Sequence, residues 1–226
     1  MIPLKDTIRS RSFPVVNYTI IAINILIFLY EFSLGRRIEP FIREYGLTPV
    51  RFFWGLNHNL HDAILPIFTS MFLHAGWLHV LGNMWFLYIF GDNVEDRVGH
   101  VGYIFFYLLC GVGAALSQTI LLRDSSVPMV GASGAIAGVL GAYFLLFPHA
   151  RVLTLVPIFI FIQLIEIPAF VFLLIWFLLQ FLTMTPMQSA AEGGVAWWAH
   201  IGGFLVGMFL IFFFKKRETR STLYYE

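Results

Sequence analysis

Charged residues are scarce in this chain. Only 12% of its 226 residues are Asp, Glu, Lys or Arg, whereas 59% are hydrophobic, and the mean hydropathy is +0.80. A soluble domain usually carries about 25% charged residues, so the composition excludes an ordinary soluble globular protein and indicates a membrane protein. The net charge of +1 gives no reason to expect a nucleic-acid partner.

Cysteine is almost absent as well. The single cysteine, Cys110, lies in an apolar run and excludes an intramolecular disulfide. A small-residue cleavage site is also lacking after the apolar stretch that follows Lys5, Arg9 and Arg11. We therefore expect a retained signal-anchor helix and not a removed signal peptide.

The apolar residues are grouped into stretches long enough to span a membrane. A helix that crosses the hydrocarbon core needs about 20 mostly apolar residues. The candidate spans are Val15–Phe32, Leu78–Phe90 with its flanks, Val101–Leu122, Ser133–Phe147, Ile167–Leu182 and Val195–Phe214. The stretch Val152–Leu182 is too long for one span and too short for two with a turn, and Pro157 and Pro168 interrupt it. We expect Val152–Glu166 to be an interfacial or irregular lead-in to one span. The predicted fold class is an all-α polytopic membrane protein with six transmembrane helices.

Six spans place both termini on one side of the membrane. Most of the 14 Lys and Arg residues lie in the terminal segments and in the loops on that same side, which favours cytoplasmic termini. We therefore expect a membrane domain at 15–214, flanked by cytoplasmic segments at 1–14 and 215–226. The long loop Ser33–Trp77 is expected to carry its own structure against the outer membrane surface.

Ser133 is a candidate nucleophile. It lies in the motif Gly131-Ala132-Ser133-Gly134 at the start of the fourth span, where unpaired backbone N–H groups can bind a developing oxyanion. Gly134, Gly138 and Ala142 also give the small-xxx-small spacing of helix-packing surfaces, and for an isolated membrane serine that structural interpretation is the usual one. The two interpretations are compatible here.

His200 opens the sixth span and is a candidate base for Ser133. A serine needs a base before it can attack a carbonyl, and histidine is the usual one. Gly203 and Gly207 project from nearly the same helix face as His200, so they allow close approach of the helix that begins at Ser133. Without a serine nearby, a histidine bonded to a neighbouring carbonyl would be the plainer interpretation.

A third polar group opens the second span. His79 and Asn83 are four residues apart and share a helix face, so both can donate to one oxyanion. His74 is expected at the end of the preceding loop, shaping His79 by hydrogen bonding. A rival interpretation is a metal site built from His74, His79 and His200, with His58 or His61. No metal is expected, because the first two histidines fall on different faces and no carboxylate accompanies them.

The direction of the spans brings three of these residues together. Spans two, four and six run the same way, so His79, Ser133 and His200 fall in the same outer half of the membrane. No Asp or Glu is expected near them in that half, so a serine–histidine pair would act without an acid.

Two further polar groups are interpreted as structural. The run Gly91–Arg97 is expected to end the second span as a polar helix end that satisfies carbonyls and fixes a turn. Asn17 and Asn24 share a face of the first span, and we expect both to hydrogen-bond to a neighbouring helix.

The motifs Gly131-Ala132-Ser133-Gly134, His79-x-x-x-Asn83 and Ala199-His200-x-x-Gly203-x-x-x-Gly207 together resemble those of the rhomboid family of intramembrane serine proteases. The run Gly91–Asp96 is similar to that of bacterial members, and the motifs follow the family's order over most of the chain. The resemblance implies six helices around a water-filled cavity open to the outside. Polar groups at membrane depth independently require such a protein-lined cavity.

The resemblance also implies roles for individual residues. Ser133 would be the nucleophile, and His200 would act as general base and then as general acid. His79, Asn83 and the backbone N–H of Ser133 would line the oxyanion hole, with Gly131 keeping that backbone open. No cofactor is implied.

The fifth span and the loop after it would control access. The resemblance implies that Pro168–Leu182 acts as a lateral gate and Thr185–Ala196 as a cap. Where some members carry an aromatic residue that packs on the histidine, this chain has Ala137. Either another ring, from Trp197 or Trp198, orients the histidine, or no aromatic residue does.

We therefore predict an intramembrane serine endopeptidase that cleaves transmembrane segments through an acyl-enzyme. Its partners would be membrane-protein substrates and the lipid bilayer. It would lie in a plasma or inner membrane, with the active site toward the extracytoplasmic side. One alternative is a catalytically silent rhomboid-like helix-binding or quality-control protein, although such relatives usually lack the serine or the histidine. A small transporter would be expected to contain inverted repeats, and none is visible in the sequence.

Overall fold

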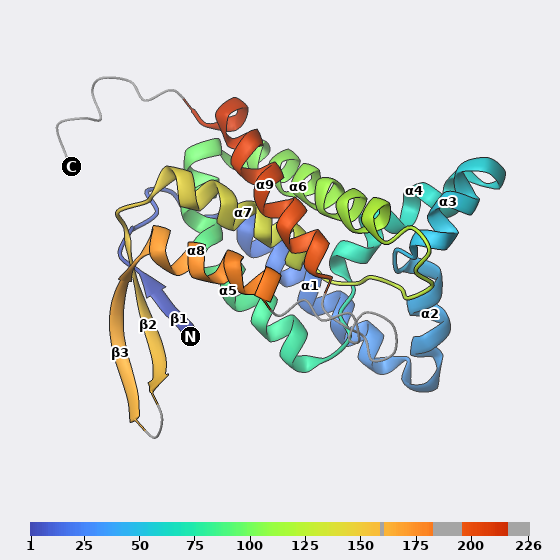
Figure 1. Cartoon of the computed structure of the whole chain (residues 1–226), viewed down its shortest axis with the longest axis horizontal. Coiled ribbons are helices and arrows are strands. Elements are labelled where there is room, and N and C mark those ends of the chain that lie inside the picture. The colour runs from blue at the N-terminus through green and yellow to red at the C-terminus, as the bar shows by residue number, and fades with distance from the viewer. Residues whose placement is uncertain (159–160, 183–195, 217–226) are drawn as a thin grey trace.

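The computed structural model describes residues 1–158, 161–182 and 196–216. Its long helices pack side by side as a bundle (Figure 1). The bundle helices are α1 (Val15–Ser33), α5 (Trp77–Val98), α6 (His100–Leu121), α7 (Ser133–Leu146), α8 (Ala169–Leu182) and α9 (Trp197–Phe214). Each coincides with one of the predicted spans, and the all-α polytopic fold class is confirmed.

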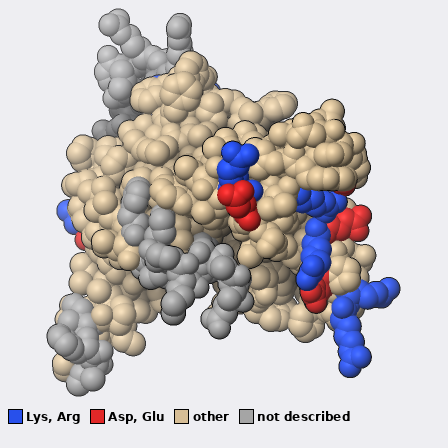
Figure 2. Space-filling model, turned by 45° about the vertical axis from the view of Figure 1, so that its right-hand side comes forward, with Lys and Arg blue, Asp and Glu red and all other residues tan. Residues whose placement is uncertain are grey.

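The bundle has the length and the surface of a membrane protein. Helices α1, α6 and α9 are each long and apolar enough to cross a membrane. Helix α5 passes the same test together with Leu60–Phe72, from which it is bent by 79°, while α7 and α8 are shorter apolar helices. Large apolar side chains such as Leu26, Phe105 and Phe213 are exposed, and Figure 2 shows a face that is mostly uncharged, with charged side chains gathered toward one side. The chain is therefore a multi-pass membrane protein.

Helices α5, α7 and α9 run in the same direction, as the span count predicts. Their far ends lie together: the Lys216 N–H after α9 donates to the Arg97 carbonyl of α5 at 2.8 Å. Tyr143 of α7 and Asn93 of α5 both donate to Asp6 of the N-terminal segment. The N-terminal strand and the end of α9 accordingly lie at the same end of the bundle (Figure 1). The first turns of these three helices are therefore neighbours at the opposite end.

A three-stranded antiparallel sheet lies beside the bundle at the end that holds the N-terminus (Figure 1). Strand β2 (Arg151–Ile158) pairs on one side with β1 (Ile2–Asp6) and on the other with β3 (Phe161–Pro168). The expectation that Val152–Glu166 is irregular is therefore wrong, whereas the single helix expected after it, α8, is present. This stretch is rich in Val, Ile, Leu and Thr, which favour strands. Strand β1, which pairs with β2, comes from a distant segment that the local sequence does not reveal.

The long segment between α1 and α5 has its own structure, as predicted. It contains η1 (Gly35–Arg37), α2 (Ile38–Tyr45), α3 (Pro49–His58), α4 (Leu60–Thr69) and η2 (Ser70–Phe72). Pro49 occupies the first turn of α3, where its missing N–H costs nothing, and the Asn59 side chain accepts the His61 N–H at 3.2 Å to cap α4. Leu47, Phe52 and other apolar residues form a separate small core beneath these helices.

The polar run Gly91–Arg97 forms the last turns of α5, which ends at Val98, so the predicted polar helix end is confirmed. In addition, the Glu95 carboxylate accepts the backbone N–H groups of Val16 at 3.0 Å and Asn17 at 2.7 Å. These are orphan donors at the start of α1, where a negative charge is also favourable. The run therefore also caps a neighbouring helix, a contact that the sequence analysis did not predict.

The two asparagines of α1 behave differently. The Asn17 side chain donates to the Leu87 carbonyl of α5 at 3.0 Å, which confirms the predicted contact with a neighbouring helix. The Asn24 amide donates to the Ile20 carbonyl within α1 at 2.8 Å, and the Asn24 side chain also interacts with the Tyr107 hydroxyl of the neighbouring helix α6.

Glycines let α7 and α9 approach each other at backbone distance. A Cβ atom on Gly203 would lie 2.1 Å from the Gly134 carbonyl oxygen, and one on Gly207 would lie 2.0 Å from the Gly138 carbonyl oxygen. Real side chains do not tolerate such distances, so a larger residue forces the two helices apart. The predicted close approach of the helices that begin at Ser133 and near His200 is confirmed.

The substitution Gly207→Ala tests this packing. It should lower the free energy of unfolding by roughly 1–3 kcal/mol, because overpacking a tight helix contact displaces backbone. The midpoint of thermal unfolding in detergent, followed by tryptophan fluorescence, measures the loss. Gly102→Ala is the matched control, since its Cβ would lie at an ordinary 3.6 Å from Val98. Equal midpoints for the two variants would contradict the close approach.

Asp6 anchors strand β1 to the bundle. Its carboxylate accepts hydrogen bonds from the Tyr143 hydroxyl at 2.5 Å and from the Asn93 amide at 2.9 Å. Burial raises the pKa of Asp6 from 3.8 to about 7, with a further contribution from the neighbouring Asp92 carboxylate. The docked strand therefore binds a proton more tightly than the free strand does.

Docking of β1 should accordingly depend on pH. Because the pKa of Asp6 is higher in the docked state, proton binding by Asp6 stabilises the docked strand. This stabilisation is complete below about pH 4 and is lost as the pH rises through 7. Hydrogen exchange of the β1 amides, corrected for intrinsic rates, should show weaker protection at pH 8 than at pH 5. Asp6→Asn should remove this difference, and an unchanged pH dependence in that variant would refute the assignment to Asp6.

Candidate active site

Ser133 and His200 form a hydrogen-bonded pair. Ser133 is the first residue of α7 and His200 lies in the first turn of α9, and the serine Oγ is 2.8 Å from the histidine Nε2. The close packing of α7 on α9 produces this distance, since both residues lie at the same end of the two parallel helices. The structure therefore brings together the two residues that the sequence analysis pairs.

Gln180 of α8 holds the other side of the His200 ring. Its Oε1 is 2.8 Å from His200 Nδ1, while its own amide nitrogen donates to the Trp176 carbonyl at 2.8 Å. The sequence analysis missed this residue. A glutamine within the otherwise apolar run 169–182 is the signal that marks it, because polar side chains in membrane helices usually have a specific partner.

Two tryptophan rings also border the histidine. Trp176 lies with its ring centroid 5.9 Å from that of His200, and Trp197 packs edge-on at 6.1 Å. Of the alternatives left open by the absence of an aromatic residue at Ala137, a ring from Trp197 agrees with this contact. Trp176 adds a second ring from α8.

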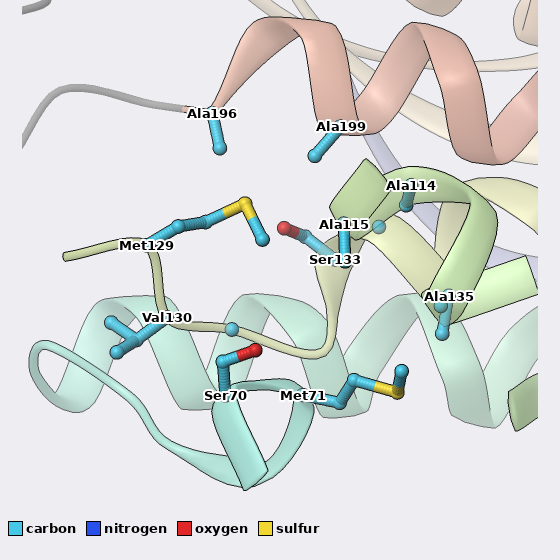
Figure 3. Close-up of a pocket in the computed structure, with 13 residues that line it drawn as sticks. Ser70, Met71, Ala114, Ala115, Met129, Val130, Ser133, Ala135, Ala196 and Ala199 are labelled. Carbon is cyan, nitrogen blue, oxygen red and sulfur yellow. The ribbon is translucent and has the colours of Figure 1, made fainter. Parts of the chain in front are cut away.

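Gly131 shapes the loop before Ser133. Its φ of +128° is a conformation that favours glycine, and its N–H donates to the Ser70 carbonyl at 2.9 Å. A Cβ atom here would lie 2.7 Å from His79 Nε2, so only glycine lets the histidine approach this loop. Figure 3 shows the Ser133 hydroxyl pointing into the space bordered by Met129, Ala196 and Ala199.

Asn83 is bound to His74 and not left free on its helix. The Asn83 amide nitrogen is 2.9 Å from His74 Nε2. The predicted hydrogen bond from His74 to His79 is therefore wrong, because those two rings meet edge-to-face with centroids 5.1 Å apart. The bond to His74 fixes the orientation of the Asn83 amide, which lies one helical turn after His79.

A buried carboxylate supports this group, contrary to the sequence-based expectation. Glu31, near the end of α1, is 1% exposed and accepts the backbone N–H of His74 at 3.1 Å. It binds the His74 backbone and not the ring of His200. The residue was missed because it lies 43 positions before its partner.

These groups surround one cavity. Its volume is about 940 Å³, and it is lined by His79, Asn83, Ser133, Trp176 and His200 among others. Within residues 1–158, 161–182 and 196–216, no three His, Cys, Asp or Glu side chains are grouped as a metal site would require. Of the predicted cap, residues 185–196, all but Ala196 lie outside the described residues.

The arrangement has the parts that acyl transfer needs. A serine hydroxyl faces a histidine nitrogen, side chains of His79 and Asn83 line the same cavity, and the unpaired N–H groups at the start of α7 lie beside the hydroxyl. Fold and site thus define a class: a helical multi-pass membrane protein with a serine–histidine pair in a cavity between its helices.

Comparison with known families agrees with that class. The rhomboid domain matches residues 61–217, well over half of the chain, so the chain belongs to the rhomboid family. This confirms the resemblance seen in the motifs.

Individual relatives match over parts of their length. Rhomboid-like protein 11, chloroplastic, of Arabidopsis thaliana is 45% identical over 37% of this chain and 29% of its own. Rhomboid protein 1, mitochondrial, of Saccharomyces cerevisiae is 30% identical over 62% of this chain and 38% of its own. Inactive rhomboid protein 1 of Rattus norvegicus is 31% identical over 75% of this chain and 17% of its own. The chain thus matches less than half the length of each relative.

The buried Glu31 offers a test of the support beneath Asn83. Glu31→Leu leaves the His74 N–H without its acceptor, which should cost about 1–3 kcal/mol of folding free energy. Glu39→Leu is the control, because Glu39 makes only an exposed pair with Arg43 and such pairs contribute little. Thermal unfolding in detergent should separate the two variants, and similar midpoints would argue against the role given to Glu31.

Proposed function

We propose that this rhomboid-family protein is an intramembrane serine endopeptidase that cleaves membrane-spanning segments of other membrane proteins. The observation that carries the proposal is the 2.8 Å contact between Ser133 Oγ and His200 Nε2. Polar side chains such as serine and histidine cost free energy at membrane depth, so their presence there usually marks a functional site. This pair also lies in a cavity large enough for an unwound peptide segment.

In the proposed reaction, Ser133 Oγ attacks the peptide carbonyl carbon while His200 Nε2 takes the hydroxyl proton. The negative charge that develops on the carbonyl oxygen is stabilised by His79, Asn83 and the Ser133 backbone N–H. The C–N bond then breaks, and His200 returns the proton to the leaving amine. Water attacks the acyl-enzyme, again giving a proton to His200, which passes it to Ser133 as the ester bond breaks.

The proposal also includes an orientation in a cell membrane. The basic residues of the terminal segments favour a cytoplasmic position for both chain ends, which directs the cavity toward the extracytoplasmic side of a plasma or inner membrane. Substrate helices would then reach Ser133 beside α8, from the outer half of the bilayer.

A catalytically silent helix-binding protein is the second candidate. The match to an inactive rhomboid protein over 75% of this chain favours it. The presence of both Ser133 and His200 within hydrogen-bond distance favours the protease.

Covalent labelling separates these candidates. The wild-type protein, reconstituted in liposomes with a labelled single-span substrate, should cleave the substrate and react with a fluorophosphonate at Ser133. Ser133→Ala should lose both activities, because the nucleophile is gone. Ser117→Ala is the matched control: Ser117 is also a membrane-helix serine, but its hydroxyl donates to the Gly113 carbonyl.

Two results would overturn the protease. One is equal cleavage by the wild type and Ser133→Ala, and the other is a wild type that the fluorophosphonate does not label. A wild type that binds the substrate helix without cleavage or labelling would favour the silent helix-binding protein.

A further inference from the structure

We infer that Gln180 is a positioning residue that holds His200 in the tautomer able to accept the Ser133 proton. The inference rests on the proposed function, because it assigns how the proposed base is oriented. It also accounts for the missing aromatic residue at Ala137, since the ring is held by a hydrogen bond from α8 in addition to its aromatic neighbours.

The first step is the orientation of the Gln180 amide. Its nitrogen donates to the Trp176 carbonyl oxygen, one turn earlier in α8, at 2.8 Å. If the amide were turned over, its oxygen would face that carbonyl oxygen, and two acceptors would repel each other. The backbone of α8 therefore fixes the amide with Oε1 toward His200.

The second step is the tautomer of the ring. Gln180 Oε1 lies 2.8 Å from His200 Nδ1 and is only an acceptor, so Nδ1 must carry the hydrogen. A neutral imidazole has a single N–H, which leaves Nε2 with its lone pair toward Ser133. The Ser133 hydroxyl then donates to Nε2 across 2.8 Å, the arrangement that proton transfer requires.

The third step is burial. Gln180 is 6% exposed and His200 is 8% exposed, so water has little access to replace this hydrogen bond. The amide takes the place that a buried carboxylate has in serine–histidine–aspartate sites, without placing a negative charge in the bundle. Loss of the acceptor would leave the ring free to carry its hydrogen on Nε2, where it cannot act as base.

The test removes the acceptor and watches both the ring and the serine. Gln180→Met keeps the length of the side chain but removes its oxygen. Gln118→Met is the matched control, because the Gln118 oxygen accepts the backbone N–H of Ala199 at 3.2 Å and does not bond to the ring. ¹⁵N NMR of histidine-labelled protein, assigned with His200→Ala, reports the tautomer, and fluorophosphonate labelling reports the reactivity of Ser133.

We expect Gln180→Met to shift His200 toward the Nε2–H tautomer and to slow Ser133 labelling about tenfold, the factor that one lost hydrogen bond typically corresponds to. Gln118→Met should keep the wild-type tautomer and the wild-type labelling rate. If Gln180→Met does not keep the wild-type thermal midpoint, Gln180→Leu removes the same acceptor with a different shape.

An unchanged tautomer and labelling rate in a folded acceptor-free variant would overturn the inference. Failure of the proposed function looks different. In that case the wild type is not labelled at all, while the NMR signals of His200 still respond to the loss of the Gln180 acceptor.

Discussion

The pairing of polar side chains inside an apolar bundle is the constraint on which this structure depends. Lipid offers no hydrogen bonds, so partners for a polar group at membrane depth must come from the protein or from a cavity that the protein encloses. Two hydrogen-bonded rows meet this need, and each reaches the cavity: one is Ser133, His200 and Gln180, and the other is Asn83, His74 and Glu31. Each row joins different helices, so the groups that define the site also fix the bundle.

Backbone packing is the second requirement, and it explains the glycines. Carbonyls of α7 lie where a Cβ on Gly203 or Gly207 would be, so α9 approaches more closely than side chains would permit. That separation sets the distance between a hydroxyl on one helix and a ring on the other. Helix packing and the proposed chemistry are therefore two consequences of the same small residues, and neither interpretation of the Gly131-Ala132-Ser133-Gly134 motif excludes the other.

Most of the fold follows from the sequence, because hydropathy and the direction of successive spans are local or countable properties. These properties predict the bundle helices and the contact between Ser133 and His200. They also predict that α5, α7 and α9 all begin at the same end of the bundle. They do not predict Glu31 or Gln180, whose significance depends on neighbours 43 and 20 residues away. The β2–β3 hairpin was missed for a similar reason, since it is completed by residues from the far end of the chain.

The sheet that β1 completes has a consequence for the order of assembly during synthesis. Ile2 pairs with Leu155 and Asp6 with Val152, so β1 leaves the ribosome before its partner β2 and has to wait for it until four bundle helices have been made. At ordinary rates of translation the delay is roughly 10–30 s. Throughout that interval the N-terminal segment has to stay on the side where β2 will emerge. Closure of the sheet is therefore a late event, and it joins the start of the chain to a bundle whose first helices are already in the bilayer.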